Sequence, residues 1–144
     1  MKSNKLQNAK KTERGQSLTE LAVSFTLLMM LLGIAVDGGR LFFSYIAVRE
    51  AAEEGALHGA LYPSDSDGIS ERVRTSSSNP VDLTDTSLVS VADTLIGSAC
   101  AGNSIRVTVT YTFNLTMPFV GAILGSQQFP LAAESTATVL RPGC

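Results

Sequence analysis

The sequence has no tryptophan, one histidine and two cysteines, and this scarcity excludes several kinds of site. Cys100 and Cys144 lie far apart and outside any CxxC pair, so no zinc site is predicted. No cysteine or acidic ligand pattern surrounds His58, which is predicted to be a helix-surface residue rather than a metal ligand. No serine or threonine has a base close by in sequence, so we expect no catalytic residues, no enzyme activity and no cofactor.

Positive charge is scarce beyond the first fifteen residues. Residues 1–15 carry five basic groups and one acidic group, a net +4, whereas residues 16–144 carry six basic and twelve acidic groups, a net −6. No basic patch follows the leader, which argues against nucleic-acid binding. A basic leader in front of an apolar run instead predicts that the N-terminus stays in the cytoplasm.

Residues 21–36 form the longest apolar run and contain no charge. With residues 16–20 the stretch reaches twenty-one residues, in which only Glu20 is ionisable. About twenty residues of helix cross a bilayer core, so a single membrane-spanning helix is predicted. A cleaved signal peptide is the alternative, but no small-x-small cleavage site follows. A buried core helix would normally show a polar stripe.

The junction between leader and apolar run reads Arg14-Gly15-Gln16-Ser17-Leu18-Thr19-Glu20. A protease at the inner membrane face needs an extended, accessible bond, and Gly15 lets backbone approach closely. A carboxylate near the start of a membrane helix is costly, which makes Glu20 a functional candidate. Cleavage after Gly15 would give Gln16 a positive amine, with which the Glu20 of a neighbouring subunit could pair.

A glycine, four residues, a glutamate and a long apolar run resemble the prepilin-peptidase site of type IV pilins. The continuation resembles the TadE-like family of pseudopilins from tight-adherence (Tad/Flp) pilus systems. The motifs that carry the resemblance are Arg14-Gly15, Glu20, an acidic-Gly-Arg turn at residues 37–40, the aromatic residues Phe42, Phe43 and Tyr45, and the Ala/Glu-rich residues 51–56. Two positions depart from the family pattern, because Glu53 replaces the usual arginine and Leu57-His58 replace Arg-Tyr-type residues.

The resemblance implies a minor pilin or pseudopilin that acts in pilus assembly or adhesion. It implies that a prepilin peptidase cuts between Gly15 and Gln16 and that Arg14 and Glu20 serve processing and assembly. The expected partners are this peptidase, other pilin subunits, the Tad assembly machinery and the lipid bilayer. The alternative is a permanently membrane-anchored, exported binding module that never enters a filament. The sister TadF-like group stays open, as does a place at the tip, in the shaft or in the assembly platform.

The expected fold class is α+β and pilin-like, with a long N-terminal helix, membrane-spanning in its first half, on a small antiparallel sheet. The expected segments are a basic cytoplasmic leader (1–15), a transmembrane helix (16–37), its continuation (38–60) and an exported globular domain (61–144). Gly33 and Gly38-Gly39 are predicted soft spots for a bend or local melting. Helical spacing places one set of side chains on the packed face: Leu41, Tyr45, Val48, Ala52 and Ala56.

Short elements are predicted beyond the long helix. Strands are expected at residues 88–92, 105–113 and 131–140, the second on strict alternation of apolar and polar residues. Residues 61–68 are expected as a loop and 69–75 as a short helix. Within that loop the run from Asp65 to Gly68 looks like the opening of a calcium loop, but the later ligands are missing, which favours a turn. Residues 117–125 are too short to span a membrane and are interpreted as a core-facing turn, a short helix or an exposed apolar patch.

Cys100 and Cys144 would both lie on the exported, oxidising side, where disulfides persist. A bond between them could stabilise a small domain by about 4 kcal/mol in the chain-entropy estimate. Two free or intermolecular thiols are the alternative.

Overall fold

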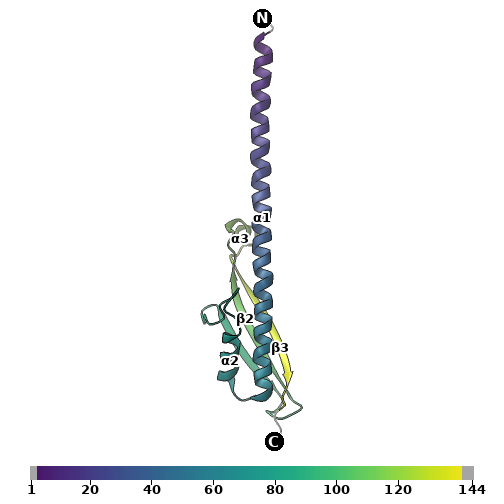
Figure 1. Cartoon of the computed structure of the whole chain (residues 1–144), viewed down its shortest axis with the longest axis vertical. Helices are drawn as coiled ribbons and strands as arrows, with labels where there is room; N and C mark the ends of the chain where they lie inside the picture. The colour runs from purple at the N-terminus through teal and green to yellow at the C-terminus, as the bar shows by residue number, and fades with distance from the viewer. Residues whose placement is uncertain (1–2, 141–144) are drawn as a thin grey trace. The chain divides into compact units, whose positions relative to one another are not determined.

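The computed structural model describes residues 3–140, with the side chains of residues 15–117 and 120–140. The chain divides into two compact units, Met1–Val36 and Asp37–Cys144, and helix α1 (Ser3–Leu61) contributes to both (Figure 1).

The first unit consists of the N-terminal part of α1. Its apolar side chains are exposed in the chain alone, from Leu18 to Val36. The twenty-two residues 15–36 span about 33 Å as a helix, close to the thickness of a bilayer core. Within the described residues, α1 is the one helix long and apolar enough to cross a membrane. Gly33 and Gly38-Gly39 are helical in this structure, and the boundary between the two units falls between them; the predicted bend or local melting at these glycines stays a prediction.

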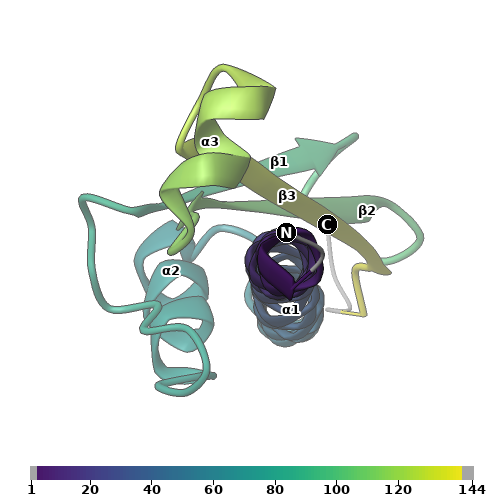
Figure 2. The ribbon, with the colours of Figure 1, turned by 90° about the horizontal axis from the view of Figure 1, so that it is seen from above.

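The second unit contains a three-stranded antiparallel sheet in the order β1-β2-β3, formed by Val89–Ile96, Ser104–Asn114 and Gln128–Thr138. The second part of α1 and helix α2 (Ser66–Thr75) lie on the same side of this sheet (Figure 2). The predicted α+β fold, a long helix on a small antiparallel sheet, is confirmed. Strands β1 and β3 are the outer strands, and Pro130 lies within β3.

The core lies where α1 and α2 meet the sheet. Val48, Ala52 and Ala56 are buried as predicted, but Tyr45 is 43% exposed and Ser44 is buried in its place. Small residues on α1 let this helix lie close to α2 and the sheet. A Cβ built on Gly55 would lie 2.6 Å from Val73 Cγ2, too close for a real contact. The other buried apolar side chains come mostly from the strands and from α2: Ile69, Val73, Val81, Leu83, Val89, Ile105, Val107, Val109 and Ala133.

Helix α2 begins at Ser66, so the predicted loop through Gly68 ends too late. Asp65 is the N-cap, and its Oδ1 accepts the backbone N–H of Gly68 at 3.1 Å. This side-chain bond satisfies one of the free N–H groups at a helix start, which explains why the acidic run opens a helix.

Helix α3 (Pro118–Leu124) joins β2 to β3. It starts with proline at its first position and ends at Gly125, whose φ of 75° lies in the left-handed region that favours glycine. Ile123 and Leu124 are exposed, and the helix itself carries no charged residue. The short-helix interpretation of residues 117–125 agrees with this element, and its apolar end is exposed.

Candidate functional site

The Gly15-Gln16 peptide bond lies inside α1. The Thr19 hydroxyl donates to the Gly15 carbonyl at 2.9 Å, which adds a side-chain bond to the helical turn. This bond is therefore helical in the free chain, and a protease that needs an extended bond would have to unwind about one turn of α1. Arg14 also belongs to α1 by its backbone, but its side chain lies outside the described residues.

Glu20 is exposed on the same helix face as Gln16. Together with Thr19, Val23 and Ser24 these two residues line a shallow hollow on the helix surface. Residues four apart on a helix stand one above the other, about 5–6 Å between Cβ atoms. The structure thus brings two predicted site residues, Gln16 and Glu20, to one patch, and the carboxylate is open to a partner.

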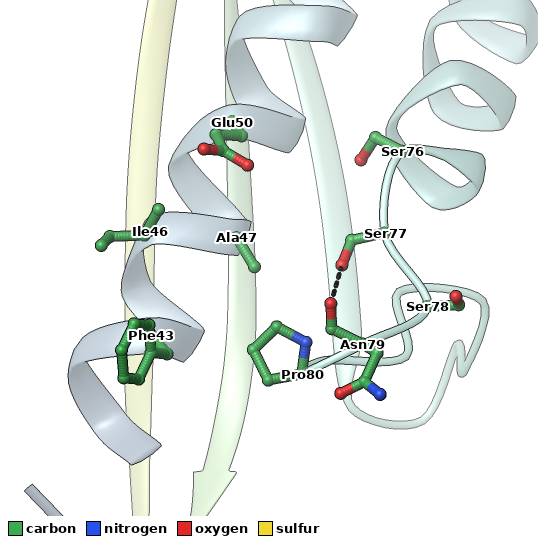
Figure 3. A pocket seen from close by; sticks show the side chains of 9 residues that line it. All are labelled: Phe43, Ile46, Ala47, Glu50, Ser76, Ser77, Ser78, Asn79 and Pro80. Carbon is green, nitrogen blue, oxygen red and sulfur yellow. Dashed lines mark hydrogen bonds between the residues drawn. The ribbon is translucent and has the colours of Figure 1, made fainter. Parts of the chain in front are cut away.

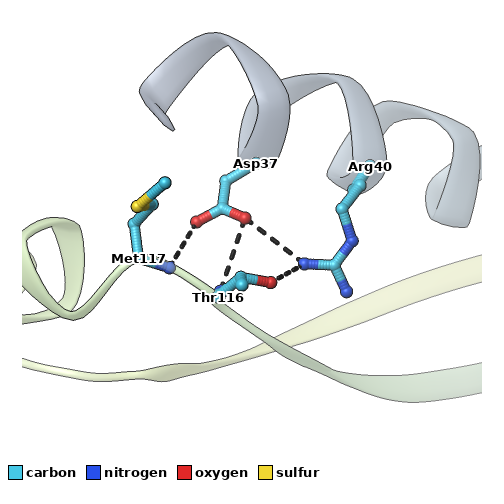
Figure 4. A network of polar contacts seen from close by, with 4 residues as sticks. All are labelled: Asp37, Arg40, Thr116 and Met117. Atoms are coloured by element: carbon cyan, nitrogen blue, oxygen red, sulfur yellow. Dashed lines mark hydrogen bonds and ion pairs between the residues drawn. The ribbon is translucent and has the colours of Figure 1, made fainter. Parts of the chain in front are cut away.

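A second polar cluster joins α1 to the start of α3 (Figure 4). The Asp37 side chain is only 3% exposed. Its two carboxylate oxygens accept the backbone N–H of Met117 at 2.9 Å and that of Thr116 at 3.4 Å. Arg40 lies one helical turn further on and donates to Asp37 Oδ1 at 3.3 Å. We call these four residues the Asp37 clamp.

Arg40 also ties the clamp to the sheet. Its Nη1 donates to the Thr116 hydroxyl as well as to Asp37. Its guanidinium lies 5.4 Å from the ring centroid of Phe113, the last large buried side chain of β2, at a distance that suits a cation–π interaction. The predicted acidic-Gly-Arg turn at residues 37–40 is thus a helical turn. The sequence could not show its role, because the partners lie 79 and 80 residues away.

A groove of about 370 Å³ separates α1 from the segment that follows α2 (Figure 3). Its floor is apolar, with Phe43, Ile46 and Ala47 of α1, and Glu50 lies at its edge. Ser76, Ser77, Ser78, Asn79 and Pro80 form the opposite wall. An apolar floor with a few polar groups at the rim can hold a small apolar group that carries a hydrogen-bond donor.

His58 and Asp65 make a contact that sequence reasoning missed. His58 Nε2 lies 3.2 Å from Asp65 Oδ2, and the histidine ring also contacts Tyr62, with 5.1 Å between ring centroids. The Gly68 N–H and, after it, His58 hold the pKa of the Asp65 carboxyl below its usual value of 3.8. The carboxylate therefore caps a helix. Among the described residues no cluster of three or more His, Cys, Asp or Glu side chains could hold a metal ion.

The predicted disulfide involves Cys144, which lies outside the described residues. The pairing with Cys100 stays a prediction.

Residues 15–57 match the family described as TadE-like protein, as the motifs at Arg14-Gly15, Glu20 and 37–40 led us to expect. No curated protein and no solved structure matches the chain.

Proposed function

From the match of residues 15–57 to TadE-like proteins, we propose that this chain is a minor pilin or pseudopilin of a Tad-type pilus. In this proposal α1 first anchors the chain in a membrane, with the N-terminus in the cytoplasm and the second unit outside. The family match and the apolar helix support a coarser statement, that of a pilus-associated protein with one membrane-spanning helix.

The observation that carries the proposal is the position of Gly15, Gln16 and Glu20 at the start of an exposed apolar helix surface. A prepilin peptidase cuts after Gly15 and leaves a positive amine on Gln16. Glu20 lies one turn away on the same face and is open to an amine from a neighbouring subunit. Such a pair strengthens when helices pack in a low-dielectric environment, so it sets the register of subunits as they leave the bilayer.

The large exposed apolar side chains of α1 also support assembly. Leu21, Phe25, Leu28 and Leu32 are each more than half exposed in the isolated chain. A bilayer covers such a surface before assembly, and the helices of other subunits cover it afterwards. The function is then mechanical, and the peptidase is a partner rather than an activity of this chain.

The test is intact mass and N-terminal sequencing of the membrane-associated protein from its native host. A mature chain that begins at Gln16 is the expected result. A Gly15→Val variant should keep its leader. Nothing lies within 4 Å of a Cβ built on Gly15, so the loss of cleavage would reflect a failure of the peptidase to cut the variant and not misfolding. A chain that begins at Met1 in the unaltered protein would refute processing, and a start beyond Val36 would indicate a signal peptide.

Glu20→Ala tests assembly separately from cleavage. We expect this variant to be cleaved and to fail to enter filaments. Glu53→Ala is the matched control, because Glu53 is an exposed carboxylate on the same helix that pairs only with Arg49, at 3.0 Å, among the described residues. Equal incorporation of both variants would contradict the role of Glu20.

A permanently anchored binding module is the second candidate, and the groove between α1 and residues 76–80 favours it. Glu50 at the edge of the groove makes no ion pair with any described residue, so its charge is available to a ligand. Retention of the leader in the unaltered protein, together with unchanged ligand binding by the Glu20→Ala variant, would favour this function over the first.

A further inference from the structure

We propose that helix α3 and its exposed apolar end lie in the membrane–water interface. There they give the second unit a shallow membrane contact of its own, in addition to the membrane-spanning part of α1. The occupant of this surface is lipid. The inference rests on the proposed anchoring of α1 in a bilayer and adds a contact that this anchoring does not require.

The Asp37 clamp carries the argument. Asp37 is bonded directly to Val36, the last residue of the apolar run, and its carboxylate holds the Met117 N–H at 2.9 Å. Consecutive Cα atoms are 3.8 Å apart, so at any angle between the two units the backbone N–H of Met117, the N-cap of α3, lies within about 10 Å of the end of that run. The interfacial layer on each side of the hydrocarbon core is about 5–8 Å thick. The start of α3 therefore lies in or next to this layer whenever residues 16–36 span the core.

The composition around α3 suits that environment. Residues 107–133 contain no charged residue, although they include two strand segments, a helix and two connections. The nearest charges on either side, Arg106 of β2 and Glu134 of β3, form a diagonal ion pair with 3.9 Å between charged atoms. In water an exposed hairpin end normally carries polar and charged residues, because loops run over the surface. An uncharged hairpin end next to a membrane-spanning segment instead suits the membrane–water interface.

Exposed side chains supply the contact itself. Ile123 is 68% exposed and Leu124 is 58% exposed, both near the end of α3. Phe42 and Phe43, less than two turns beyond Asp37, are also exposed and pack edge to face at 5.8 Å between ring centroids. Aromatic and apolar side chains at this depth enter the boundary between headgroups and acyl chains. Arg40 lies next to them with a half-exposed side chain and suits anionic headgroups.

Tryptophan fluorescence tests the proposal, because the chain has no tryptophan of its own. The full chain is reconstituted in phosphatidylcholine vesicles that carry bromine either near the headgroup end or near the middle of the acyl chains. Ile123→Trp reports on α3. Leu57→Trp is the control in the second unit. Leu57 is similarly exposed, at 61%, and lies about 30 Å beyond Asp37 along α1. Leu28→Trp, in the apolar run at 59% exposure, reports on the span itself.

The expected result is a blue-shifted emission of Ile123→Trp with loss of intensity in the vesicles brominated near the headgroup. Leu57→Trp should keep its intensity in both kinds of vesicle, and Leu28→Trp should lose it with mid-chain bromine. If Leu28→Trp is quenched while Ile123→Trp behaves like Leu57→Trp, the second contact is refuted and the anchor stands. A blue shift of Ile123→Trp without quenching by either lipid would mean that protein covers α3, which also refutes it. An unquenched Leu28→Trp would refute the anchor and this inference together.

Discussion

Replacing Asp37 by alanine should release the start of α3 from α1 without unfolding the core. The carboxylate is almost completely buried and is the acceptor for two backbone N–H groups and for Arg40. Hydrogen bonds to a charged group contribute about 1.5–3 kcal/mol, and a buried donor left without a partner costs a similar amount. Part of this loss is recovered, because the variant no longer buries a charge. We therefore expect local opening around residues 115–125 to become easier by about 2–3 kcal/mol.

Backbone hydrogen exchange of the full chain in detergent measures this opening. A change of 2–3 kcal/mol corresponds to about 30- to 150-fold faster exchange, since each 1.4 kcal/mol is a factor of ten. The acceleration should be confined to residues 115–125, whereas the core segment of α1 should keep its protection, because the buried core cluster contains none of the clamp residues.

Glu53→Ala is the control for this prediction. Glu53 also pairs with an arginine of α1, at 3.0 Å, but both side chains are about half exposed or more. An exposed pair of this kind contributes about 0.3–0.5 kcal/mol, so exchange should change by less than about threefold. Asp37→Asn keeps one acceptor oxygen and loses the charge, which predicts an intermediate effect. Equal exchange over residues 115–125 in Asp37→Ala and Glu53→Ala would refute the reasoning.

Three further predictions concern packing, pH and the cysteines. Gly55→Ala should lower the free energy of unfolding by about 1–3 kcal/mol through overpacking against Val73, whereas Gly38→Ala, with nothing within 4 Å of its Cβ, should be neutral or stabilising by up to about 1 kcal/mol; chemical denaturation measures both. The pKa of Asp65 is lowered in the folded chain, so its contribution to α2 is present above the usual value of 3.8 and is lost as the pH falls through the lower folded value. Amide protection in α2 should fall with it, and Asp65→Asn should remove this pH dependence; an unchanged pH profile in Asp65→Asn would contradict the capping role. The predicted disulfide between the two cysteines should leave neither reactive to an alkylating reagent before reduction and both reactive afterwards, by intact mass.

The regular parts of the fold could be predicted because their patterns are local. Strict alternation over residues 105–113 defines the central strand, and β2 differs from that prediction by one residue at each end. β1 runs four residues beyond its predicted end, because Ile105 and Ser104 of β2 pair with Leu95 and Ile96. A pairing partner in another strand cannot be read from the local sequence.

The site was predicted only in part, for a similar reason. The position and spacing of Gly15 and Glu20 are visible in the sequence, and the structure places Gln16 and Glu20 on one helix face. The role of Asp37 was hidden, because its hydrogen-bond partners come from a segment about eighty residues later. The buried position of Ser44 in place of Tyr45 shows a related effect. Helical spacing predicts the buried face of a helix only to within about one residue, and packing against the sheet decides which of two adjacent side chains is buried.

The two outer strands of the sheet affect how copies of this chain could pair with one another. A strand at the end of a sheet offers unpaired backbone groups that can template aggregation between chains. Pro130 in β3 has no N–H to offer, and Glu134 of β3 and Asp93 of β1 place negative charge on the two outer strands. Under the proposed function, copies gathered at high density in one bilayer would therefore be discouraged from pairing edge to edge into a continuous sheet.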